Sequence, residues 1–162
     1  MVSLSMMFLL ILGVFKKNSS KIIQNLSLLI LLITAVITFN ETLSVKQITL
    51  FNESVIIDYL SSFMKIVTLL AAFVVLLISP NYLRTFKIFK IEYPILILSS
   101  VLGMMIMISS NDLIVFYMGL ELQSLALYVL ATFDRDKLKS SEAGLKYFVL
   151  SALSSGCLLY TS

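Results

Sequence analysis

The chain has 162 residues, of which 59% are hydrophobic and only 13% are charged. Globular proteins carry about 45–50% apolar and about 25% charged residues, so this composition excludes a soluble domain and a disordered chain. The small net charge of +3 argues against nucleic-acid binding, the single cysteine excludes a disulfide framework, and the absence of histidine excludes the common zinc sites and His-based catalytic triads. An integral membrane protein is the class that remains.

Six apolar stretches follow one another along the chain. A bilayer core about 30 Å thick needs about 20 apolar residues in a helix, with a tolerated range of roughly 17–25. We therefore predict an all-α integral membrane protein with helices at 1–15, 22–39, 59–79, 94–110, 113–133 and 142–162. The last stretch has no polar end, so residues 1–162 are expected to form one membrane domain of five complete helices and part of a sixth. Pro80 is expected to end the third helix.

The basic residues alternate between the two sides of this predicted bundle. The odd-numbered loops hold nine lysines and arginines, namely Lys16, Lys17, Lys21, Arg84, Lys87, Lys90, Arg135, Lys137 and Lys139. The even-numbered loops hold only Lys46. The positive-inside rule therefore places the odd-numbered loops on the cytoplasmic or matrix side and the N-terminus outside.

Two connecting segments have patterns of their own. In ITLFNESVII, Asn52 and Glu53 separate two β-prone runs, which predicts a hairpin on the outer side; the frayed start of the third helix is the alternative. In NYLRTFKIFKIEY, aromatic residues recur every three or four positions from Tyr82 to Tyr93. That segment is expected at the membrane interface, either as an amphipathic helix or as a basic loop with tyrosine anchors.

Glu121 is the most informative charge inside a predicted span. It lies near the middle of the fifth helix, and its helical face also carries Tyr117, Ser124, Leu125 and Tyr128. Ionisable residues in spans are costly, so they are functional candidates by default. A carboxyl group that is balanced between protonation and pairing with a cation can exchange protons. A structural carboxylate that is fully hydrogen-bonded is the alternative.

Three further charges lie in or beside the spans. Lys146, in the first turns of the sixth helix, either forms a surface pair with Glu142 one turn earlier or shares a polar seam with Glu121. Lys65, early in the third helix, and Asp58, on about the same face, either reach toward the interface or belong to an ion path. We take Glu121 and Lys146 as candidate proton-transfer residues and Lys65 and Asp58 as secondary candidates. The sequence holds no evident nucleophile, phosphate loop, flavin or haem ligands, or metal site, which leaves movement of protons as the expected chemistry.

Two segments of the chain resemble a known family. NDLIVFYMGLELQSLALYVLATF and SSEAGLKYFVLSALSSGCLLY are similar to the antiporter-like subunit N of respiratory complex I, which is subunit 2 of NADH dehydrogenase in mitochondria. The specific parts are ELQSL around Glu121 and EAGLKYFVLSALSSG around Lys146. Upstream, DYLSSFMKIVTLL resembles the third helix of the family. The resemblance extends from Asp58 to the end of the sequence.

The resemblance implies an antiporter-like transmembrane helix bundle that acts as a proton-translocating subunit of NADH:quinone oxidoreductase, a translocase of the respiratory electron transport chain. In this family the counterpart of Glu121 pairs with a lysine on a broken seventh helix, and the counterpart of Lys146 lies on the same proton path. Quinone reduction elsewhere in the complex is thought to change these pairings electrostatically.

The same resemblance sets the expected surroundings of the chain. NADH, flavin, iron–sulfur clusters and ubiquinone would bind in other subunits, so no cofactor is expected here. The partners would be other complex I membrane subunits, the lipid bilayer and protons, and not nucleic acid. The location would be a bacterial or mitochondrial inner membrane, crossed several times.

Family members have many more helices than this sequence, including the one that carries the partner lysine. We therefore interpret the chain as the N-terminal portion of a longer subunit, which would not pump by itself. One alternative is the related membrane subunit of a multisubunit cation/proton antiporter, although ELQSL together with EAGLKYF favours the complex I form. A non-functional truncated remnant is the other alternative.

Overall fold

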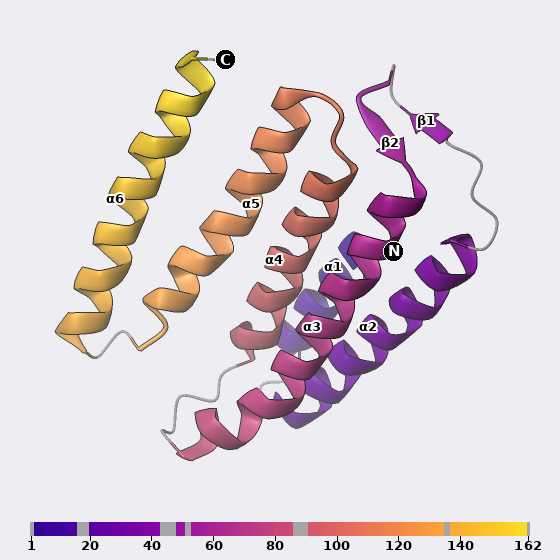
Figure 1. Cartoon of the computed structure of the whole chain (residues 1–162). Coiled ribbons are helices and arrows are strands. Elements are labelled where there is room, and N and C mark those ends of the chain that lie inside the picture. Colours follow the sequence, from indigo (N-terminus) through magenta and orange to yellow (C-terminus); the bar gives the residue numbers. More distant parts are fainter. Residues whose placement is uncertain are drawn as a thin grey trace.

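The structure is a computed structural model that describes residues 2–15, 20–42, 48–50, 53–85, 91–134 and 137–161. In these ranges the chain forms helices and one short hairpin (Figure 1). The helices are α1 (Val2–Phe15), α2 (Ser20–Thr42), α3 (Tyr59–Thr85), α4 (Glu92–Ser109), α5 (Leu113–Ala131) and α6 (Leu138–Thr161), and the strands are β1 (Ile48–Leu50) and β2 (Val55–Ile57). The helices α2 to α6 are long and apolar enough to cross a membrane, whereas α1 is a shorter apolar helix. The predicted all-α membrane fold is confirmed.

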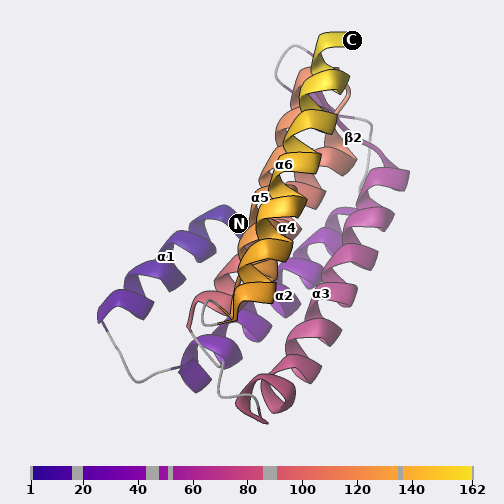
Figure 2. The ribbon, with the colours of Figure 1, turned by 90° about the vertical axis from the view of Figure 1, so that its left-hand side faces the viewer.

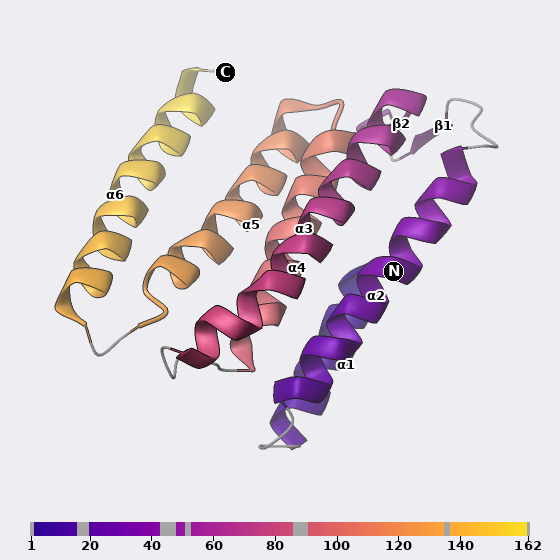
Figure 3. The same ribbon diagram turned by 60° about the horizontal axis from the view of Figure 1, so that its bottom comes forward.

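Three helices stand in a row, and the other three pack beside one end of that row. The row consists of α6, α5 and α4, and α6 lies at its outer edge (Figures 1 and 3). Figure 2 looks along the row and shows α1 on one side of it and α3 on the other. The remaining helix, α2, contacts α1, α3 and α4 and completes the packing at that end.

The hydrophobic core lies among the first four helices. Its buried side chains are all aliphatic and come from α1 to α4: Leu9, Ile23, Leu31, Leu69, Ala72, Leu76, Leu98 and Val101. Buried aliphatic side chains pack at high density, so a core of this kind tolerates little change in side-chain volume. The core therefore fixes α1 to α4 relative to one another, and α5 is attached to it through α4.

The predicted hairpin is present, and the alternative of a frayed helix is excluded for this segment. The strands β1 and β2 pair antiparallel, with Ile48 opposite Ile57 and Leu50 opposite Val55. In the turn, Glu53 has a φ of 68°, in the left-handed region that non-glycine residues seldom adopt. Asn111 holds the turn in place, because its backbone N–H donates to the Ser54 carbonyl at 2.9 Å and its side-chain amide donates to the Glu53 carbonyl at 2.8 Å. The hairpin is thus tied to the connection between α4 and α5.

The prediction that Pro80 ends the third helix is wrong, since α3 continues through Pro80 to Thr85. Proline has no backbone N–H, so the carbonyl of Leu76 one turn earlier loses its helical donor. The side-chain amide of Gln24 on α2 donates to this carbonyl at 2.9 Å, and the bond is buried. A donor from a neighbouring helix thereby removes the main penalty of a proline inside a membrane helix.

The ends of two other predicted segments also differ from the sequence-based expectation. The sixth helix begins at Leu138 and has 24 residues, because the backbone N–H groups of Ser140 and Ser141 already bond to the Lys137 carbonyl. The predicted interfacial segment lies partly outside the described residues, which resume at position 91. Within it, the Tyr93 hydroxyl donates to Ser79 Oγ at 3.1 Å, so this ring packs against α3.

Candidate functional site

The helix that carries Glu121 lies directly against α4, backbone to backbone. A Cβ atom added at Gly103 of α4 would lie 2.7 Å from the backbone nitrogen of Gln123, and one added at Gly119 would lie 2.8 Å from the backbone nitrogen of Met107. Real side chains do not approach backbone atoms this closely, so both positions require glycine. The two glycines bring α5 onto α4 within one turn of Glu121 and so fix the depth of the carboxylate in the bundle.

Glu121 carries a carboxylate oxygen that is out of contact with solvent. Its Oε2 atom is buried and has no hydrogen-bond partner among the described residues. The predicted hydroxyl neighbours do not supply one: Ser124 Oγ donates to the backbone carbonyl of Glu121 at 3.0 Å, and the buried Tyr128 hydroxyl itself has no partner in the described part of the chain. Leu125, predicted on the same face, is exposed. Among the described residues, Oε2 of the half-buried Glu121 therefore lacks the hydrogen bond that a purely structural role would require.

Lys146 lies apart from Glu121 and makes a local ion pair. Its Nζ atom is 2.6 Å from Oε1 of Glu142, one turn earlier, and the two side chains are 68% and 63% exposed. Of the two arrangements that the sequence left open, the surface pair is the one observed. The predicted polar seam with Glu121 is not formed among the described residues. Its place between the two helices is taken by aromatic rings.

Aromatic and small residues make the contact between α5 and α6. The Tyr128 ring meets the rings of Tyr147 and Phe148 edge to face, at centroid distances of 4.9 and 5.5 Å. Nearer the connecting loop, a Cβ atom added at Gly144 would lie 1.9 Å from the Thr132 side chain. This aromatic contact could not be predicted from the sequence, because it depends on how the two helices are rotated about their axes. It leaves Lys146 on the face of α6 that points away from α5.

The loop between α5 and α6 carries a further ion pair. Lys137 Nζ lies 2.7 Å from Asp134 Oδ2. The hydrogen bond to Asp134, with the carboxylate charge, raises the pKa of Lys137 above its ordinary value. Lys137 therefore keeps its positive charge across the physiological pH range. The described residues contain no cluster of three or more acidic or cysteine side chains that could hold a metal ion.

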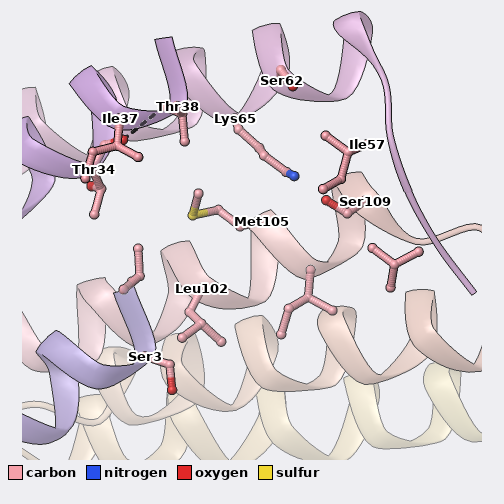
Figure 4. Close-up of a pocket in the computed structure, with 13 residues that line it drawn as sticks. Ser3, Thr34, Ile37, Thr38, Ile57, Ser62, Lys65, Leu102, Met105 and Ser109 are labelled. Carbon is pink, nitrogen blue, oxygen red and sulfur yellow. Dashed lines mark hydrogen bonds between the residues drawn. The ribbon is translucent and has the colours of Figure 1, made fainter. Parts of the chain in front are cut away.

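Lys65 points into a cavity between the helices (Figure 4). The cavity has a volume of about 410 Å³, and its wall combines aliphatic side chains with the hydroxyl groups of Thr34, Thr38, Ser62 and Ser109. Because Val55 and Ile57 of the hairpin also line this cavity, the arrangement leaves both expectations for Lys65 open, reach toward the interface and a place on an ion path. The direction of Lys65 could not be read from the sequence, because α2 and α4 form the opposite walls.

Asp58 lies beside this cavity, at the start of α3. Its backbone carbonyl accepts bonds from the N–H of Ser62 and the hydroxyl of Ser61, both at 3.0 Å, which begins the helix. The carboxylate atom Oδ1 is buried without a hydrogen-bond partner among the described residues. Asp58 lines a second cavity of about 370 Å³, and Ser109 lines both. The structure thus brings Asp58 and Lys65 to neighbouring cavities, far along the chain from Glu121 and Lys146.

Comparison with known proteins shows what this chain is similar to. The family model described as "NADH:quinone oxidoreductase/Mrp antiporter, TM" matches residues 110–162, which contain α5 and α6. A protein of Pelagibacter ubique named NADH-quinone oxidoreductase subunit N is 69% identical over 159 residues, covering 98% of this chain and 34% of the relative. A protein of the same name from Maricaulis maris is 51% identical over 156 residues, covering 95% of this chain and 32% of the relative.

A solved structure gives the same result. A chain of respiratory complex I from Thermus thermophilus, determined with bound aureothin, superposes with a TM-score of 0.81 at 25% sequence identity, covering 98% of this chain and 34% of that chain. The present chain therefore spans about a third of the length of the relatives that it matches. The antiporter-like helix bundle and the resemblance to subunit N that ELQSL and EAGLKYFVLSALSSG indicated are both confirmed.

Proposed function

The chain resembles the N-terminal part of subunit N of NADH:quinone oxidoreductases over nearly its whole length, and we propose that it forms part of a proton-translocating membrane subunit of such a complex. It would work as one component of a translocase whose redox groups, NADH, flavin, iron–sulfur clusters and quinone, bind in other subunits. Its partners would be the remaining membrane subunits and lipid. The membrane would be the inner membrane of a bacterium or mitochondrion, with the odd-numbered loops on the cytoplasmic or matrix side.

The buried carboxylate of Glu121 is the observation that carries this proposal. An ionised carboxylate with an unpaired buried oxygen in an apolar helix costs several kcal/mol, so the group is either protonated or paired with a cation that approaches it. No such cation lies against Oε2 among the described residues. A lysine supplied by the rest of the subunit could pair with the ionised carboxylate, and moving that lysine away would favour the protonated carboxyl group. Each change from one of these states to the other takes up or releases a proton.

Lys146 is proposed as the second group on this path, although its present partner is Glu142. Exposed i,i+4 ion pairs contribute only about 0.3–0.5 kcal/mol, so a competing carboxylate can replace Glu142 at little cost. Lys65 and Asp58 are proposed as secondary protonatable groups near the hairpin. None of these roles requires a metal or an organic cofactor in this chain.

The test is the Glu121→Gln variant of the complete subunit, assembled in its complex. We expect NADH-driven proton pumping, followed by quenching of a pH-sensitive dye in inverted membrane vesicles, to fall by about tenfold or more, since a neutral amide cannot carry the proton. Glu92→Gln is the matched control, because Glu92 is exposed in the first turn of α4. If Glu121→Gln pumps as well as Glu92→Gln, the carboxylate has a structural role.

A cation/proton antiporter subunit is the second candidate. The matching family model is described for both NADH:quinone oxidoreductase and the Mrp antiporter, and it covers the helix that carries Glu121. Vesicles that contain the complete subunit and its partners would distinguish the two. Proton uptake driven by NADH supports the oxidoreductase, whereas collapse of a proton gradient on addition of Na⁺ or K⁺ without NADH supports the antiporter.

The interpretation of the chain as the N-terminal portion of a longer subunit is tested most directly at the gene. The DNA beyond the codon for Ser162 is expected to continue in frame and to encode a further apolar helix with a lysine. A stop codon there, with no second gene that supplies the remaining helices, would support the truncated remnant instead.

A further inference from the structure

The Lys65 cavity lies at the end of the bundle that carries the hairpin. Its wall includes Val55 and Ile57 of β2 and Ser109, the last residue of α4. The neighbouring cavity around Asp58 is lined by Asn111, which is exposed in the turn between α4 and α5. Ser109 lines both cavities, so the Asp58 cavity, which reaches the exposed turn at Asn111, adjoins the Lys65 cavity at this residue.

The wall of the Lys65 cavity is mostly apolar, but it contains one lysine and several hydroxyl groups. A charged lysine inside a membrane helix is stable when it faces a water-filled cavity or polar partners. Five hydroxyl-bearing residues line the cavity: Ser3, Thr34, Thr38, Ser62 and Ser109. The side-chain oxygens of Thr34 and Thr38 donate to carbonyls of their own helix and keep lone pairs that can accept from water. A volume of about 410 Å³ holds several water molecules.

The orphaned oxygen of Asp58 points to the same conclusion independently. A buried carboxylate oxygen without a hydrogen bond is costly, and ordered water is the usual partner of such groups. Among the described residues no donor reaches Asp58 Oδ1, although it borders a cavity of about 370 Å³. Water in that cavity would lie beside the Asp58 side chain, and a small rearrangement of the carboxylate would let it donate to Oδ1.

We infer that the Lys65 and Asp58 cavities form one water-filled vestibule that opens at the hairpin side of the membrane and connects the Lys65 ammonium with the solution there. Its ligands are water and small hydrophilic ions, the hydrated proton among them. Lys65 exchanges its protons with the hairpin side alone. The inference stands whether or not the subunit pumps protons through Glu121.

Cysteine accessibility in the assembled complex tests the vestibule. In a Cys157→Ser background, Lys65→Cys and Met105→Cys place a thiol in the cavity, and each is compared with two controls on α3: Leu69→Cys, fully buried in the aliphatic core, and Val67→Cys, 45% exposed on the outer surface of the bundle. Membrane-impermeant methanethiosulfonates react with the thiolate, which forms in water and not among lipid tails. We expect both cavity thiols to react at least about tenfold faster than both controls, and only when the reagent is added at the hairpin side.

The charge of Lys65 gives a second readout that does not depend on replacing it. With Lys65 present, the thiol of Met105→Cys is expected to react faster with an anionic methanethiosulfonate than with a cationic one of equal size. Adding Lys65→Met should change each rate by about threefold in opposite directions, as one unit charge at close range in water does.

Three results would overturn the inference. Rates at positions 65 and 105 equal to those of the controls mean that the space holds no water. Reaction only with a membrane-permeant maleimide means that a lipid chain fills the cavity, and reaction from the side opposite the hairpin means that the vestibule opens in the other direction.

Discussion

The first four helices and the last two are built on different principles. The helices α1 to α4 share one aliphatic core, and 39% of the most apolar stretch of α4 is buried. In α6 the corresponding share is 11%, and α6 packs mainly on α5 at the edge of the row (Figure 1). The candidate proton-transfer residues Glu121 and Lys146 lie in this less enclosed part. The first four helices therefore act as a scaffold, whereas α5 and α6 carry charges whose partners are not all supplied by the described residues.

The substitution with the largest expected effect on stability lies at the contact between α4 and α5, where these two parts of the molecule meet. Gly103→Ala places a Cβ atom 2.7 Å from the backbone of α5, so the two helices must separate or shift. Overpacking of this kind costs about 1–3 kcal/mol, occasionally more. We expect a clear loss of thermal stability of the purified complex, together with a loss of the activity that depends on Glu121.

Gly156→Ala is the matched control for that substitution. It makes the same change in α6, but among the described residues no atom outside the backbone of α6 lies within 4 Å of the added Cβ. Alanine favours a helix over glycine by about 1 kcal/mol, so this variant should be unchanged or slightly more stable. Equal stability of the two variants would show that α5 is not held against α4 by its backbone.

Inside the scaffold, the next largest loss of stability is expected from removing the hydrogen bond that Gln24 donates to the Leu76 carbonyl. Gln24→Leu leaves the carbonyl that Pro80 cannot satisfy without a donor, at an expected cost of about 1–3 kcal/mol. Adding Pro80→Ala restores the helical N–H and should recover most of that loss. The measurement is a double-mutant cycle on the melting temperature of the complex. Additive effects of the two substitutions would mean that Gln24 does not compensate for Pro80.

The same bond explains what the sequence could and could not predict. Span lengths and composition predict the membrane helices because each depends on local hydrophobicity alone. The hairpin is predicted by the two β-prone runs on either side of Asn52 and Glu53, which is also a local property of the sequence. The effect of Pro80 was predicted wrongly because the compensating donor is Gln24, which lies 52 positions before the Leu76 carbonyl that it bonds. The direction of Lys65 likewise depends on α2 and α4.

At the candidate site, the sequence predicts where the charged residues lie along the helices but not which groups their side chains contact. The burial of Glu121 was expected from its place in α5, but its lack of hydrogen-bonded hydroxyls was not, because Ser124 bonds to its own helix backbone. For Lys146 the sequence allowed two arrangements, and the one that needs only a neighbour on the same helix is observed. The contribution of that ion pair to stability and to proton pumping can be measured by replacing Glu142.

The smallest effect is expected from Glu142→Gln. The substitution removes the partner of Lys146, but both side chains are exposed, so the stability of the complex should fall by no more than about 0.5 kcal/mol, and less at high salt. Proton pumping should be kept or slightly raised, because Lys146 is then released toward other carboxylates. A loss of pumping as large as that of Glu121→Gln, with the complex still assembled, would assign Glu142 itself to the proton path. In that case the ion pair on α6 would be a working part of the site rather than a contact on its surface.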